Sequence, residues 1–295
     1  MTSLRRWMRS GVVLAVWACA QPVPPASPGR DLPARLAAAP LESLLAVGEG
    51  TYYRGQYDSV RVLWLGALDR ARELRDSVAE ARLITWLGLV AWRQGDYKTA
   101  RRLGEQALAL KLQLNLRQQL FKSYNALGLL AWNEARVHDA VMLFGKAADA
   151  AREAGDDKGL ASVSGNLALV HTELGDFAAA RAGFLTARDG GRRLQDARLE
   201  GNALTNLGML DIRVGDPLSA VAALEEARQR YRMIAYATGE QNALGQLGTA
   251  YDALGEPRLA LAALDSALGE ARAQGLQQDE ASDLEALARL YQEAG

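Results

Sequence analysis

A period of 40 residues runs through most of this chain of 295 residues. One column of the period pairs a large apolar residue with a small one: Val47-Gly48, Leu87-Gly88, Leu127-Gly128, Leu167-Ala168, Leu207-Gly208, Leu247-Gly248 and Leu287-Ala288. A second column is alanine in six successive repeats: Ala67, Ala107, Ala147, Ala187, Ala227 and Ala267. Because a fixed period of this length marks stacked supersecondary units, the sequence restricts the chain to a repeat architecture.

Each repeat is predicted to contain two helices. No proline occurs between Leu41 and Asp216, and alanine, leucine, arginine and glutamate, all good helix formers, dominate that stretch. The pairs Gly95-Asp96, Gly175-Asp176 and Gly215-Asp216 favour the end of one helix at the glycine and a capped start of the next at the acid. The pattern therefore predicts an all-α fold, an α-solenoid of stacked antiparallel helix pairs.

The repeat resembles the tetratricopeptide repeat (TPR) over residues 41–295. The resemblance rests on Leu87-Gly88, Gly95-Asp96-Tyr97, Ala100 and Ala107, and on their counterparts in the other repeats. The longer period, together with Asn166-Leu167-Ala168 and Asn206-Leu207-Gly208, is similar to that of kinesin light chains and related cell-polarity adaptors. The resemblance implies a right-handed superhelical α-solenoid. We expect six repeats that begin near residues 41, 78, 118, 158, 198 and 238, and a seventh first helix at 278–294.

The N-terminal segment has the features of an export signal. Arg5, Arg6 and Arg9 precede a short apolar stretch at 11–18, which is too short to cross a bilayer as a helix. Val16-Trp17-Ala18-Cys19 resembles the bacterial lipobox, in which the cysteine is acylated. We predict a signal peptide at 1–18, lipidation at Cys19 and a proline-rich tether at 19–40. The protein would then be a lipoprotein on the periplasmic side of a bacterial membrane. The alternatives are cleavage after Ala20, which yields a soluble periplasmic or secreted protein, and an uncleaved N-terminus.

Composition argues against several functional classes. Lysine and arginine number 34 against 35 acidic residues, so the net charge of −1 does not favour a nucleic-acid binder. The single cysteine cannot form an internal disulfide or a thiolate zinc site. The two histidines, His138 and His171, lie in different repeats, and no phosphate-loop, nucleophile-elbow or zincin motif occurs. We therefore predict no enzymatic activity, no cofactor or metal, and no small-molecule substrate.

An aromatic column lies in the first helices. Tyr52, Trp92 and Trp132 recur at the period of the repeat, whereas Trp64 and Trp86 are assigned to packing. The column is flanked by Arg82, Arg93, Lys122 and Asn133. One interpretation is an aromatic shelf that binds an apolar peptide carrying a negative charge. The other is that the rings pack against the next helix, and the sequence leaves both open.

A carboxamide column follows further along the chain. It contains Asn166, Asn206 and Gln246, with Asn202 and Asn242 one helical turn away. Carboxamides donate and accept hydrogen bonds, so they can hold an extended peptide by its backbone. The resemblance to kinesin light chains implies this role for Asn166 and Asn206. Alternatively, these side chains cap or crosslink neighbouring helices.

The function favoured by the sequence is a non-catalytic adaptor that binds peptide segments of other proteins. The resemblance implies that the first helices line a concave groove, where such a peptide would lie. The alternatives are a structural or assembly subunit of an envelope complex and the regulatory half of a longer TPR-containing protease. The identity of the protein partner cannot be derived from the sequence.

Two glycines predict a soft point in the second helix of the fourth repeat. Gly190-Gly191 occupies a place where the other repeats carry residues such as Arg70-Ala71 and Ala150-Ala151. Each glycine inside a helix costs about 0.5–1 kcal/mol relative to alanine. We therefore expect this helix to end early or to kink.

Overall fold

The computed structural model of the chain describes residues 39–294. The predicted signal peptide, Cys19 and most of the predicted tether therefore lie outside the described residues. Thirteen α-helices and no strand occur in the part that is described, which confirms the all-α solenoid. No helix in this part is both long enough and apolar enough to span a membrane.

The helices alternate between first and second members of each repeat. The first helices are α3 (Leu41–Tyr53), α5 (Ser77–Arg93), α7 (Leu120–Asn133), α9 (Asp157–Leu174), α11 (Ala197–Val214), α13 (Ala237–Ala253) and α15 (Gln277–Ala294). The second helices are α4 (Tyr57–Glu73), α6 (Tyr97–Gln113), α8 (Val137–Glu153), α10 (Phe177–Arg193), α12 (Pro217–Met233) and α14 (Pro257–Gln274). A 3₁₀ turn, η2 (Arg117–Gln119), precedes α7.

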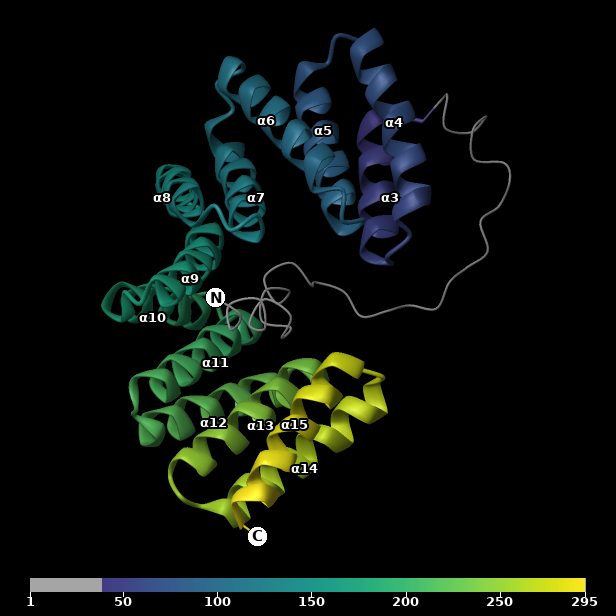
Figure 1. The fold of residues 1–295 in the computed structure, drawn as a ribbon. Helices are drawn as coiled ribbons and strands as arrows, with labels where there is room; N and C mark the ends of the chain where they lie inside the picture. The colour runs from purple at the N-terminus through teal and green to yellow at the C-terminus, as the bar shows by residue number, and fades with distance from the viewer. Residues whose placement is uncertain (1–38, 295) are drawn as a thin grey trace. The chain divides into compact units, whose positions relative to one another are not determined.

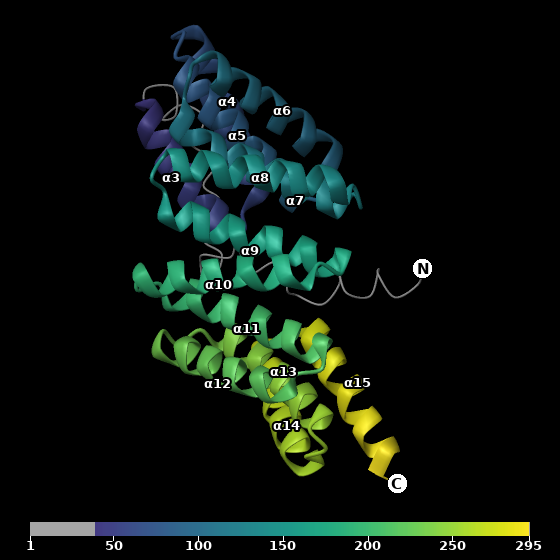
Figure 2. The same cartoon turned by 90° about the vertical axis from the view of Figure 1, so that its left-hand side faces the viewer.

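The described helices form two compact units, α3–α8 and α9–α15, which divide after Asp156. Within each unit, every helix packs against the next one along the chain (Figures 1 and 2). Within each unit, successive first helices also contact one another, as α11 contacts α13, and no pair of described second helices does so to a similar extent. Each unit therefore has a first-helix layer and a second-helix layer.

The turns at Gly95-Asp96 and Gly215-Asp216 have the predicted geometry, in which the glycine ends one helix and the aspartate caps the next. Gly95 and Gly215 adopt left-handed backbone conformations with φ of 78° and 82°. The carboxylates of Asp96 and Asp216 accept hydrogen bonds from the backbone N–H groups of Thr99 and Ser219, at 3.0 and 3.1 Å. The hydrogen bonds from Thr99 and Ser219 hold the pKa of Asp96 and of Asp216 below the usual value. Each of these caps satisfies one of the first N–H groups of its second helix, α6 or α12.

In several repeats the small residue of the first helix makes room for a large side chain of the second helix. A methyl group added to Gly128 would lie 2.8 Å from the ring of Phe144, and one added to Gly208 would lie 2.5 Å from Leu224. Phe144 and Leu224 are fully buried. Gly48, in the first repeat, makes the same room for the indole of Trp64. The small position is therefore needed because two helices approach closely there.

The helix that contains Gly190 and Gly191 does not end early, so that part of the prediction is wrong. Helix α10 has 17 residues, the same length as α8 and α12. Both glycines are buried, and a methyl group on Gly190 would lie 2.5 Å from Cβ of Ala161 on α9. One on Gly191 would lie 2.5 Å from the backbone nitrogen of Glu200 on α11. The glycines permit close packing on two sides, and this packing offsets their low helix propensity.

A recurring ion pair connects each of several second helices to the first helix that follows. An arginine in the last turn of the second helix contacts a glutamate eight residues later. The pairs are Arg72–Glu80 at 2.9 Å, Arg192–Glu200 at 2.9 Å, Arg272–Glu280 at 2.8 Å, and Arg232–Glu240. At the two remaining junctions, Leu120 and Leu160 occupy the place of the glutamate. Because the arginines are about half exposed, each isolated pair adds only modestly to stability.

Candidate functional site

Two rings of the aromatic column belong to the core. Tyr52 is 3% exposed and Trp132 is 5% exposed. The ring of Tyr52 packs edge-on against Trp86 on α5, with centroids 5.4 Å apart, and lies near the fully buried Trp64. Because α3 and α5 contact one another, the Tyr52 ring fills space between these two first helices. An exposed shelf of three rings is therefore not formed, and for Tyr52 and Trp132 the structure favours the packing alternative.

Trp92 is the half-buried member of the column. The guanidinium of Arg93 lies 5.1 Å from the centroid of Trp92 and donates from Nε to the hydroxyl of Tyr52 at 3.1 Å. Burial raises the pKa of Tyr52, although the hydrogen bond from Arg93 opposes that shift. Arg93 thus connects α5 to α3, while part of the Trp92 ring remains at the surface.

The polar residues that flank the aromatic column have different environments. Arg82 forms an ion pair with Glu42 of the preceding first helix, at 2.5 Å. Lys122 is exposed, and its ammonium lies 5.8 Å from the centroid of Phe121. Asn133 is exposed at the end of α7. Lys122 and Asn133 therefore lie at the surface, whereas Arg82 already neutralises a carboxylate.

The residues of the carboxamide column also differ in how deeply they are buried. Asn166 is only 1% exposed, so its side chain is buried. The Oδ1 atom of Asn202 accepts a hydrogen bond from the hydroxyl of Tyr231 on α12, at 2.9 Å. Asn202 therefore crosslinks two helices, as the alternative interpretation expected. Asn206, Asn242 and Gln246 are partly exposed on α11 and α13.

Three carboxamides thus remain on neighbouring first helices that contact each other. Met209 and Thr249 lie about one turn beyond Asn206 and Gln246, and both are also partly exposed. Residues three or four positions apart share one face of a helix. We call the set Asn206, Met209, Asn242, Gln246 and Thr249 the carboxamide surface. It combines hydrogen-bonding groups of both kinds with apolar contact area.

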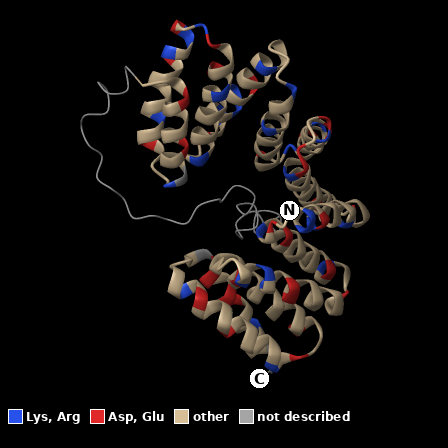
Figure 3. Ribbon diagram, turned by 180° about the vertical axis from the view of Figure 1, so that it is seen from behind, with Lys and Arg blue, Asp and Glu red and all other residues tan. Residues whose placement is uncertain are grey.

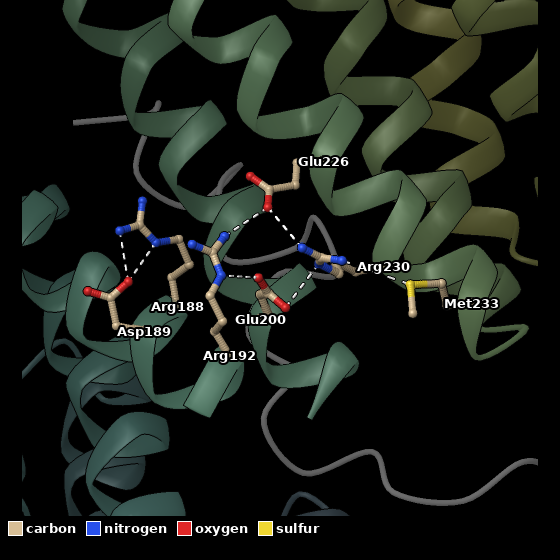
Figure 4. A network of polar contacts seen from close by, with 7 residues as sticks. All are labelled: Arg188, Asp189, Arg192, Glu200, Glu226, Arg230 and Met233. Atoms are coloured by element: carbon tan, nitrogen blue, oxygen red, sulfur yellow. Dashed lines mark hydrogen bonds and ion pairs between the residues drawn. The ribbon is translucent and has the colours of Figure 1, made fainter. Parts of the chain in front are cut away.

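An ionic network around the buried Glu200, which the sequence analysis did not identify, connects α10, α11 and α12 (Figure 4). Glu200 is 5% exposed, its Oε1 atom accepts from Nε of Arg192 at 2.9 Å, and its Oε2 atom forms an ion pair with Nε of Arg230, also at 2.9 Å. Glu226 contacts the same two arginines, at 2.9 and 3.1 Å. The hydrogen bond with Glu200 raises the pKa of Arg192. The recurrence of arginine and glutamate eight residues apart could have indicated this network in the sequence.

A buried lysine was also missed. Lys111 is 2% exposed, and its ammonium donates to Oγ of Ser123 at 2.9 Å. The same register position holds Ala71, Ala151 and Gly191 in other repeats. Burial lowers the pKa of Lys111 to about 8, and the nearby charge of Lys122 adds to the shift. Because other repeats hold small residues at this position, the repeat pattern carried no chemical signal for Lys111.

The two histidines do not belong to a cluster of metal-ligating side chains in the described part of the chain. His138 is exposed on α8, and Nδ1 of His171 lies 3.6 Å from a carboxylate oxygen of Asp176. Within residues 39–294, no group of three or more metal-ligating side chains occurs.

Comparisons with known proteins rest on structure, because no family model and no curated protein matches the chain. A similar solved structure is BtubC (BKLC) from P. vanneervenii, with 21% identity and a TM-score of 0.64, covering 80% of this chain and 93% of that one. A second is a Rap protein complexed with competence and sporulation factor, with 13% identity, a TM-score of 0.64 and coverage of 88% and 78%. A third is a putative kinesin light chain from P. anserina with nearly identical TPR-like repeats, at 16% identity, a TM-score of 0.55 and coverage of 65% and 96%.

The chain has the TPR fold. At identities this low, the similarity establishes the arrangement of the TPR helices and leaves the ligand to be argued from the residues themselves.

Proposed function

We propose that this TPR protein is a non-catalytic adaptor that binds extended peptide segments of other proteins on the carboxamide surface of α9–α15. The observation that carries the proposal is the position of Asn206 and Gln246, which recur at the period of the repeat and reach the surface from contacting helices. An extended peptide exposes N–H and C=O groups along its length, and a carboxamide can pair with either. Met209 adds apolar contact for a side chain of the ligand.

The similar structures support a protein or peptide ligand. The Rap protein is described as a complex with competence and sporulation factor, and the P. anserina protein is described as a putative kinesin light chain. A repeat fold of stacked helices presents an extended surface, which suits a linear ligand.

Trp92 supplies a second candidate contact, within α3–α8. Its half-buried ring lies beside the guanidinium of Arg93, and the exposed Asn133 occupies the register position of Arg93 on the following first helix. An aromatic or aliphatic side chain followed by an acid would match this set of groups. The contact concerns Trp92 alone, because Tyr52 and Trp132 are buried.

Export and lipid anchoring belong to the same proposal and rest on the sequence of the N-terminal segment. We propose that Cys19 is acylated and that the mature protein lies on the periplasmic side of a bacterial membrane. The Cys19→Ser variant should then lose its membrane fractionation. A mature protein that begins at Gln21 would contradict lipidation and would indicate ordinary cleavage after Ala20.

Site-specific photo-crosslinking tests the adaptor function. A p-benzoylphenylalanine residue at Gln246 would lie on the carboxamide surface, and one at the exposed Gln229 of α12 would lie on the second-helix layer. We expect crosslinks from position 246 to short, extended segments of partner proteins, identified by mass spectrometry. Crosslinks from position 229 alone would instead favour an assembly role for the second-helix layer.

A further inference from the structure

The junction between α6 and α7, at residues 108–122, lacks an ion pair that the equivalent junction between α10 and α11 contains. Leu112 and Leu120 occupy the places of the arginine and the glutamate that form this pair at residues 188–202. Leu112 is 51% exposed, so it does not replace the lost contact with buried apolar surface. The end of α6 is therefore connected less firmly to the start of α7.

The first turn of α7 is also weaker than that of α11. In α11, the carboxylate of Asp196 accepts a hydrogen bond from the backbone N–H of Leu199, at 3.0 Å. Neither η2 nor α7 has a side-chain cap of this kind, and η2 takes the place of the first α-helical turn. The hydrogen bonds of a 3₁₀ turn have poorer geometry, and uncapped N–H groups lose a stabilising partner. This end of the junction therefore opens at a lower cost in free energy.

Helix α6 contributes little large apolar surface to the core. Gly104 lies at the position where α8 and α10 carry the buried rings of Phe144 and Phe184. The buried residues of α6 are Ala100, Ala107 and Lys111. The free energy gained by burial scales with the apolar area removed from water, so α6 is held less strongly than these two helices.

Lys111 destabilises the closed junction. Its buried ammonium has the hydroxyl of Ser123 as its partner, and no ion pair of Lys111 occurs within the part of the chain that the structure describes. Residues 106–133 contain no acidic residue, and the other cations of this stretch are Arg117 and Lys122 (Figure 3). Lys122 is close enough to disfavour the charge of Lys111. A buried charge without an opposite charge raises the free energy of the closed state, whereas water solvates the ammonium in an open state.

We propose that the α6–α7 junction opens locally in the folded protein and that the buried ammonium of Lys111 sets how often it opens. In the open state, residues 108–122 lose their helical hydrogen bonds while the rest of α3–α8 stays folded. Opening also affects Trp92, because Leu108 and Trp92 pack against the same buried cluster. The junction would thereby regulate the second candidate contact. This consequence rests on the proposed function, whereas the opening itself does not.

Native-state hydrogen exchange of the full chain tests the opening. Residues 188–202 serve as the reference, because they have the same register and retain the ion pair and the cap. We expect protection factors at 108–122 to be lower by about tenfold or more, and to change little in dilute urea, because a local opening exposes little surface. Equal protection of the two segments would overturn the proposal. Protection at 108–122 that falls with urea as steeply as global stability would also overturn it, because the segment would then open only when the protein unfolds.

Matched lysine variants test the role of Lys111. Lys111→Met removes the charge but keeps a side chain of similar length, and should raise the protection of 108–122 by about tenfold or more. Lys98→Met makes the same change at an exposed position of α6 and should alter this protection by less than about twofold. Lys111→Ala, which introduces the residue that α4, α8 and α14 carry at this position, is the second variant if Lys111→Met does not fold. Equal effects of Lys111→Met and Lys98→Met would overturn the assignment to Lys111.

Fluorine NMR of the protein labelled with 5-fluorotryptophan tests the consequence for Trp92. The Trp92→Phe variant identifies the resonance of Trp92. We expect exchange between the closed and open states to broaden this resonance, and Lys111→Met to sharpen it. A Trp92 resonance that Lys111→Met leaves unchanged, while the protection of 108–122 rises, would overturn the regulation of Trp92. Neither measurement uses a peptide ligand, so its outcome is separate from that of the adaptor function.

Discussion

The Nε atom of Arg192 donates to the carboxylate of Glu200, eight residues further along the chain, at a distance of 2.9 Å. The contact connects the end of α10 to the start of α11. Arg230 of α12 forms an ion pair with the other oxygen of the same carboxylate. Because Glu200 is buried, its charge depends on both arginines for compensation.

Glu200→Ala should therefore destabilise the protein. It leaves two guanidinium groups without their central acceptor, but both arginines reach solvent, so we expect a loss of about 1–3 kcal/mol. Chemical denaturation measures the change. The control is Glu105→Ala on α6, an exposed glutamate, which should change stability by less than about 0.5 kcal/mol. Equal stability of the two variants would show that the network contributes little.

Replacing Trp132 should have a large effect on stability. The ring is 5% exposed, so Trp132→Ala opens a buried cavity and should cost about 3–5 kcal/mol. Asn133→Ala, at the neighbouring exposed position, should be nearly neutral. A melting temperature for Trp132→Ala close to that of the wild type would contradict the assignment of this ring to the core.

Two glycine substitutions should change the stability of the protein in opposite directions. Gly145→Ala on α8 places a methyl group in open space and should stabilise the helix by about 0.5–1 kcal/mol. Gly191→Ala on α10 places it 2.5 Å from the backbone of Glu200, and should destabilise the protein by about 1–3 kcal/mol. Urea denaturation of both variants measures the difference. A stabilising Gly191→Ala would mean that α10 and α11 are not closely packed at this point.

Asp283 should make stability depend on pH. It is 5% exposed, its Oδ2 atom accepts from Nε2 of Gln241 at 3.0 Å, and burial, with the nearby charge of Asp279, raises its pKa to about 6. Because the folded state holds the proton more tightly than the unfolded state, the contribution to stability is greatest below about pH 4 and is lost as the pH rises to about 6.

Asp283→Asn removes this dependence. The variant should be more stable than the wild type at pH 7, by about 1–3 kcal/mol, and the difference should shrink towards pH 4. Thermal unfolding of both proteins across this range provides the comparison. A difference that stays constant with pH would show that Asp283 titrates normally.

The repeat pattern was sufficient to predict the helices, the turns and the small residues. The glycine–aspartate pairs have a local physical cause, so Gly95 and Asp96 could be interpreted without tertiary contacts. Gly190 and Gly191 could not, because their effect depends on Ala161 and Glu200, which lie on other helices. Propensity alone predicted a break where close packing keeps a continuous helix.

From the sequence, the candidate site could be predicted only as columns of equivalent repeat positions. The period identified Tyr52, Trp92 and Trp132 as equivalent, but it did not indicate how deeply each ring is buried. Similarly, Asn166 and Asn206 share a register position, yet only Asn206 is partly exposed. Exposure of a side chain depends on the neighbouring helices, so the sequence predicted a larger peptide-binding surface than the structure exposes.

The adaptor function depends most directly on Asn206 and Gln246. The decisive measurement is the dissociation constant of a partner peptide, identified by crosslinking from position 246, for the wild type and for the double variant Asn206→Ala/Gln246→Ala. Loss of two backbone hydrogen bonds should weaken binding by about tenfold to a hundredfold, without loss of the fold. Gln229→Ala on α12 should bind the peptide as the wild type does. Unchanged affinity of a folded double variant would contradict the assignment of the carboxamide surface as the peptide-binding site.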